Sequence, residues 1–106
     1  MLLQELVEAD GVSGHEGAVR DVLIKAIEGL VDEYRIDALG NLIALRRGHG
    51  NGVQGPKRVL IAAHMDEVGL MVTKVERDGS VRFQPVGGID ARVLLAKPVR
   101  IGDGRI

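Results

Sequence analysis

The residues best suited to chemistry stand together at the end of an apolar run. His64, Asp66 and Glu67 follow directly on Val59–Ala63, a succession of five apolar residues. Residues two apart in an extended backbone point to the same face, so the side chains of His64 and Asp66 are expected to project together. An imidazole can bind Zn²⁺ at about 2.0–2.1 Å, and a neighbouring carboxylate can bind the same ion or accept a hydrogen bond from the other ring nitrogen. The spacing therefore predicts a metal-ligand cluster around His64; a hydrogen-bonded structural pair is the alternative.

The other candidate side chains are assigned no role in this chemistry. Glu67 would point to the face opposite His64 and is interpreted as solvated. His15 falls in the first turn of an expected helix, where an exposed position is usual for histidine. His49 lies in the glycine-rich segment 48–55, which is expected to be an exposed, mobile loop. That segment contains no Gly-Lys-Ser/Thr sequence and opens no helix, so it lacks the features of a phosphate-binding loop.

The composition favours a globular chain and argues against nucleic acid as a partner. Of the 106 residues, 45% are hydrophobic and 2% aromatic, so the core must be built from aliphatic side chains. The net charge is −1, and Tyr34 and Phe83 are the only rings that could stack on bases. The sequence has no cysteine, which excludes thiolate metal ligands from this chain and agrees with a reducing compartment.

The expected location is the cytoplasm. Met1–Asp10 carries acidic residues where a secretory signal would have basic residues followed by a longer apolar run. No apolar stretch approaches the roughly 20 residues of a membrane span, so no membrane association is expected.

Two helices and a hairpin are predicted ahead of the His64 segment. Leu2–Val7 has apolar residues at helical spacing. Ser13 and Glu16 match a capping box, which predicts that a second helix opens there with one apolar face. That face consists of Val19, Val22, Leu23, Ala26, Ile27 and Leu30. Gly40-Asn41 then separates two strands, at 34–36 and 42–45, that are expected to pair antiparallel.

The rest of the chain is predicted to be rich in strands. Val59–Ala63 is expected to form a central strand covered on both faces, with His64 at its carboxyl end, where open α/β sheets tend to bind ligands. Asp78-Gly79 predicts a hairpin between strands at 68–75 and 81–83. Further short strands are expected at 93–95 and 99–101.

Four motifs follow one another in an order that is specific to one family. They are Gly11-Val12-Ser13-Gly14 with Glu16, Asp37 with Leu39-Gly40-Asn41-Leu42, Ala63-His64-Met65-Asp66-Glu67-Val68-Gly69, and Val86-Gly87-Gly88 leading into Arg92-Val93-Leu94. In these motifs the chain resembles the M42 family of metallo-aminopeptidases, which includes the tetrahedral aminopeptidases and proteins historically labelled endoglucanases. The resemblance covers essentially the whole chain, and the His64 segment is its most specific part.

The resemblance implies an α/β fold in two parts. Residues 1–69 would be the N-terminal part of a three-layer metallopeptidase catalytic domain, and residues 70–106 the start of an inserted β-rich oligomerisation domain. The implied enzyme removes N-terminal residues from peptides, uses two divalent metal ions, zinc or cobalt, and forms a homo-oligomer. His64 would be a metal ligand and Asp66 the catalytic-site acid that orients it. The bridging Asp, the general-base Glu and a later His of the family would lie beyond Ile106.

Two other functions stay open at this point. Gly102-Asp103-Gly104 is a turn followed by the beginning of a strand, so the chain is expected to be a piece of a longer protein and inactive by itself. One alternative is a noncatalytic assembly module built on the β-rich half, and the other is a glycan hydrolase, which the family's historical labels suggest. Glycan hydrolases generally need two carboxyls across a sugar site, a spacing that Asp66 and Glu67 on opposite faces cannot provide. Substrate preference and metal identity are left open.

Overall fold

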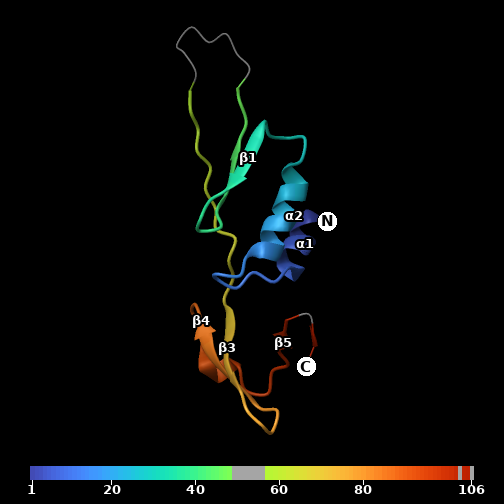
Figure 1. Cartoon of the computed structure of the whole chain (residues 1–106), viewed down its shortest axis with the longest axis vertical. Helices are drawn as coiled ribbons and strands as arrows, with labels where there is room; N and C mark the ends of the chain where they lie inside the picture. Colours follow the sequence, from blue (N-terminus) through green and yellow to red (C-terminus); the bar gives the residue numbers. More distant parts are fainter. Residues whose placement is uncertain (49–56, 103, 106) are drawn as a thin grey trace. The chain divides into compact units, whose positions relative to one another are not determined.

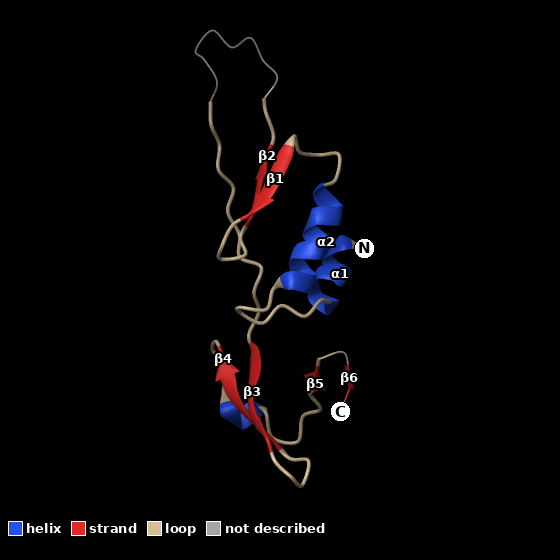
Figure 2. Cartoon of the chain, viewed as in Figure 1, coloured by secondary structure: helices blue, strands red, loops and turns tan. Residues whose placement is uncertain are grey.

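The computed structural model describes residues 1–48, 57–102, 104 and 105, and the expected loop at 48–55, with His49, lies almost wholly outside them. The chain divides into two compact units, Met1–Glu67 and Val68–Ile106. Figures 1 and 2 show helices and a hairpin in the first unit and further hairpins in the second. Assignment of residues 1–69 and 70–106 to a catalytic and an oligomerisation domain stays a prediction.

The first unit opens with two helices that contact each other, α1 (Leu2–Glu8) and α2 (Gly17–Ile27). Both predicted helices are present, but Leu30, expected on the apolar face of the second, lies beyond its end and is 59% exposed. Val19 on α2 is the most enclosed apolar side chain of the described part, with 6% of its surface exposed. Neither helix, nor any other in the described ranges, is long and apolar enough to cross a membrane.

The predicted capping box is wrong. The helix begins at Gly17 rather than after Ser13, and no side chain caps it. The carboxylate of Glu16 instead accepts a hydrogen bond from the Gly14 N–H at 2.6 Å. Gly14 has φ +86°, a left-handed conformation that glycine adopts without strain and that turns the chain before the helix can start.

The predicted hairpin is confirmed as β1 (Glu33–Ile36) paired antiparallel with β2 (Leu42–Leu45). Asp37 closes the turn, because its carboxylate accepts the Leu39 N–H at 3.0 Å and the Asn41 N–H at 2.9 Å. The side-chain amide of Asn41 adds a third bond at 2.8 Å. These bonds, led by the Asn41 side chain, hold the pKa of Asp37 below its ordinary value. The turn is therefore set by local hydrogen bonding.

The predicted central strand at Val59–Ala63 is wrong for this structure. The segment has no strand conformation, and Val59, Leu60 and Ile61 are 84%, 91% and 90% exposed. A strand needs a hydrogen-bonded neighbour, and no described residue forms a ladder with this segment. Consecutive aliphatic residues are usually buried against other polypeptide, but the described residues leave this run exposed.

The second unit is built on the long hairpin of β3 (Gly69–Val75) and β4 (Val81–Val86), as predicted. Its register shifts between Val72 and Lys74, where one strand carries an irregularity. The turn follows the Asp78-Gly79 signal, and Gly79 has φ +86°.

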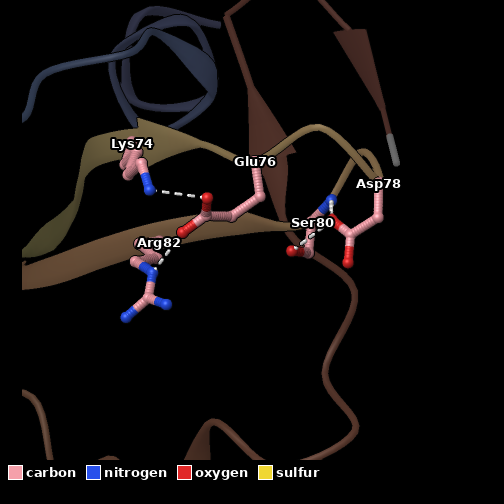
Figure 3. A network of polar contacts seen from close by, with 5 residues as sticks. All are labelled: Lys74, Glu76, Asp78, Ser80 and Arg82. Atoms are coloured by element: carbon pink, nitrogen blue, oxygen red, sulfur yellow. Dashed lines mark hydrogen bonds and ion pairs between the residues drawn. The ribbon is translucent and has the colours of Figure 1, made fainter.

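Polar and charged side chains gather at the turn end of this hairpin (Figure 3). Glu76 forms ion pairs with Lys74 and Arg82, each at 2.6 Å. Lys74, and after it Arg82, hold the pKa of Glu76 below its ordinary value. Asp78 accepts hydrogen bonds from the N–H and the hydroxyl of Ser80, at 2.9 and 2.8 Å, and these lower its pKa as well.

The strand predicted at 93–95 is wrong, because a short 3-10 helix, Ala91–Val93, occupies the start of that segment. The Asp90 carboxylate accepts the Arg92 N–H at 3.0 Å and caps this turn. Asp90 also forms an ion pair with the Arg92 guanidinium at 2.5 Å. A local cap thus overrides the β-propensity of the valine and leucines that follow. The short strand at 99–101 is present as β5 (Arg100–Ile101), which pairs antiparallel with β6 (Gly104–Arg105).

Candidate functional site

The structure brings His64 and Asp66 together as the spacing predicts. The Nδ1 atom of His64 lies 3.0 Å from Asp66 Oδ1 and 2.9 Å from the Asp66 carbonyl oxygen. Both oxygens can only accept, so Nδ1 carries the hydrogen and donates it to both. In the neutral ring this leaves the Nε2 lone pair free. The His64 side chain is 84% exposed, so the imidazole is presented to solvent rather than packed among aliphatic side chains.

A cavity of about 300 Å³ in the first unit borders this pair. Its walls include Leu23 and Ile27 from the apolar face of α2, and Leu42 and Ala44 from β2. His64, Met65, Asp66 and Glu16 also line it. The cavity is therefore largely aliphatic, with its charged groups gathered where the His64 segment meets the start of α2.

Glu16 is the functional candidate that the sequence reasoning missed. Its hydrogen bond from the Gly14 N–H lowers its pKa, while the nearby Asp66 charge acts in the opposite direction. Glu16 follows the Gly11–Gly14 motif, and this could have indicated a role at the site. The capping-box pattern, however, assigned Glu16 to helix capping.

Hydrogen bonds fix the backbone beside the pair and, separately, a wall of the cavity. The Gly11 carbonyl oxygen accepts the Glu67 N–H at 2.7 Å, and Val12 forms an isolated parallel bridge with Glu67. On the other side of the cavity, the Arg20 guanidinium donates to the Gly40 carbonyl oxygen at 2.9 Å and ties α2 to the β1–β2 turn. The segments that frame the pair are therefore fixed by hydrogen bonds between residues far apart in the sequence.

His64 has the arrangement of a single metal ligand. His64 offers a free ring nitrogen whose partner nitrogen is fixed by a carboxylate and a carbonyl, the arrangement typical of metal-binding histidines. No group of three or more His, Cys, Asp or Glu side chains that could hold an ion occurs in the described ranges. Glu67 and His15 are exposed and stand apart from the pair's hydrogen bonds. A complete site needs further donors.

Comparison with known proteins identifies the family. The sequence profile described as M42 glutamyl aminopeptidase matches residues 40–105, more than half of the chain. The chain belongs to the M42 family. A second profile, AMPT, matches residues 1–23 of this M42 chain.

Relatives of this M42 chain support the assignment. The lysyl aminopeptidase of Pyrococcus furiosus is 40% identical over 100 residues, which are 93% of this chain and 27% of that protein. A solved structure from Thermotoga maritima, named endoglucanase, has a TM-score of 0.87 and 51% identity over 97% of this chain and 32% of its own. The dodecameric PhTET1-12s has a TM-score of 0.73 and 39% identity, over 88% of this chain and 26% of its own.

The M42 chain spans about a third or less of each of these proteins. The likenesses confirm the α/β class and the match to the N-terminal part of peptidases of this family. The name endoglucanase belongs to the Thermotoga maritima protein, whereas curated relatives from Pyrococcus furiosus and Lactococcus lactis are named lysyl and glutamyl aminopeptidase. Two more distant relatives, from Pyrococcus furiosus and Thermococcus kodakarensis, are named putative hydrolases of LysW-bound lysine or ornithine.

Proposed function

We propose that this chain is the N-terminal part of a metal-dependent aminopeptidase that removes N-terminal residues from peptides. The observation that carries the proposal is the His64–Asp66 pair, in which Nδ1 lies beside two oxygens and the imidazole as a whole is 84% exposed. Membership of the M42 family and the aminopeptidase names of its relatives support the same reading.

In this proposal His64 holds one divalent ion through Nε2, and Asp66 keeps the ring in the required tautomer and orientation. Two ions, zinc or cobalt, would supply Lewis-acid polarisation of the scissile carbonyl and activation of the attacking water. The remaining donors and the general base would come from polypeptide beyond this chain. The 106-residue chain alone is therefore expected to be inactive.

The remaining parts of the proposal concern assembly and location. PhTET1-12s is a dodecamer, and we extend a homo-oligomeric state to the whole protein that carries this chain. A purely noncatalytic assembly role would leave the His64–Asp66 pair without a use. A cytoplasmic location stays a prediction from the sequence.

The test compares two histidine variants of the whole protein. His64→Ala is expected to abolish hydrolysis of aminoacyl p-nitroanilides and to lower the zinc or cobalt content of the purified protein. His15→Ala is the matched control, because His15 is an exposed histidine of the same unit and should leave both quantities unchanged. A chelator should remove the activity and added zinc or cobalt should restore it. Full turnover by the His64→Ala protein would refute the proposal, whereas turnover by the isolated chain would refute only its expected inactivity.

A further inference from the structure

Gly11 touches the backbone that carries the proposed metal ligand. It is buried between α1 and α2, and its carbonyl oxygen accepts the Glu67 N–H at 2.7 Å. A Cβ atom built on Gly11 would lie 2.6 Å from Val19 Cγ2, a distance that forces one of the two to move. Gly11 is not among the glycines with a positive φ, so the space beside Val19, rather than the backbone conformation, is what excludes a side chain.

The hydrogen bond to Gly11 continues through one peptide group to His64. The N–H of Glu67 and the C=O of Asp66 belong to the same planar unit, so neither can turn without the other. The N–H donates to Gly11, while the C=O accepts from His64 Nδ1 at 2.9 Å. Hydrogen bonds in such a chain also polarise and strengthen one another. The imidazole is thus linked to the first interhelical turn by two consecutive bonds.

We propose that Gly11 is a positioning residue that sets the orientation of the His64 ring through the Asp66–Glu67 peptide. A side chain at position 11 would push against Val19, displace the Gly11 carbonyl and rotate the peptide whose oxygen holds Nδ1. Glycine is then required at this position for the metal site as well as for packing. The inference rests on the proposed role of His64 as a metal ligand.

The test measures zinc binding to the metal-free whole protein by competition with a chromogenic chelator. Gly11→Ala is expected to weaken zinc binding about ten-fold, the lower end of what loss of an outer hydrogen-bond partner costs a metal site. Val19→Ala removes the atom that the new Cβ would meet, so Gly11→Ala combined with Val19→Ala should bind zinc as well as Val19→Ala alone. Gly17→Ala is the control, because a Cβ there meets nothing closer than 3.8 Å.

The double variant separates positioning from stability. If Gly11 served packing alone, Gly11→Ala would bind zinc like the wild type. The double variant would then differ from the wild type only in a lower melting temperature, measured by thermal unfolding. Unchanged zinc affinity in Gly11→Ala overturns the inference, and so does an equal loss in the single and double variants. If Gly11→Ala is insoluble, the double variant is compared with Val19→Ala, and weaker zinc binding by the double variant would overturn the inference, because the loss would then not arise from the contact with Val19. Loss of zinc in His64→Ala without loss in Gly11→Ala refutes the positioning role alone, whereas zinc binding by His64→Ala refutes the proposed function.

Discussion

Replacing Asp66 with asparagine tests how much the carboxylate contributes to holding the His64 ring. His64 Nδ1 donates to the Asp66 carboxylate at 3.0 Å and to the Asp66 carbonyl at 2.9 Å. Asparagine keeps a neutral side-chain oxygen, and the backbone acceptor is unchanged. What is lost is the charge of the acceptor, which makes a hydrogen bond roughly twice as strong as one between neutral groups.

The expected loss of zinc affinity depends on the backbone carbonyl of residue 66, which still accepts the hydrogen bond from Nδ1. Loss of an outer partner of a metal-binding histidine costs about 10- to 100-fold in affinity. Because the carbonyl still holds Nδ1, Asp66→Asn is expected at the lower end, about ten-fold or roughly 1.4 kcal/mol. The assay is zinc competition with a chromogenic chelator on the whole protein, with thermal melting to verify folding.

The control for this experiment is Glu67→Gln, which removes the same charge from the adjacent, exposed residue. It is expected to leave zinc affinity within about two-fold of the wild type, since exposed charges interact weakly through water. Equal losses in Asp66→Asn and Glu67→Gln would show that the net charge, rather than the bond to Nδ1, holds the metal. No loss in Asp66→Asn would refute the orienting role of the carboxylate.

Two further predictions concern the second unit. Glu76 has a pKa below its ordinary value of 4.5, chiefly through Lys74 and then Arg82, so its stabilising contribution is complete above pH 4.5 and is lost as the pH falls through the lowered value. Glu76→Gln should therefore lower the free energy of unfolding in urea at neutral pH and approach the wild type in acid; a gap that does not change with pH would contradict this. Gly87 and Gly79 have φ +83° and +86°, so alanine at either should cost about 1–2 kcal/mol, but only at Gly87 would the new Cβ lie 2.7 Å from Val68 Cγ1. Gly87→Ala should then exceed Gly79→Ala by about 1 kcal/mol in urea denaturation, and equal losses would show that Val68 moves aside freely.

The sequence predicted correctly those features that depend on contacts between residues close together in the chain. Gly40-Asn41 marks the β1–β2 turn because the bonds that close it join Asp37 to residues within four positions. The adjacency of His64 and Asp66 follows in the same way from a spacing of two residues.

Prediction failed where a stronger contact competed or where the partner is distant. Ser13 matched a capping box, but the left-handed turn at Gly14 drew the Glu16 carboxylate to a different N–H. A carboxylate cap at Asp90 likewise displaced the strand expected at 93–95. No pattern in the sequence pairs Gly11 with Glu67, since that contact joins segments at opposite ends of the first unit.

The exposed run before His64 links the metal site to the stability of the fold. Burying an aliphatic side chain of the size of Val, Leu or Ile contributes about 1.5–3 kcal/mol, while fixing each residue's backbone costs about 1–2 kcal/mol. Val59, Leu60 and Ile61 are almost fully exposed in the described structure, so their ordering is not offset by burial there. They lead directly into His64, whose ring orientation depends on the backbone that follows. Whatever covers this run in the whole protein must therefore also reduce the cost of holding His64 in place, and metal binding and covering of the run should strengthen each other.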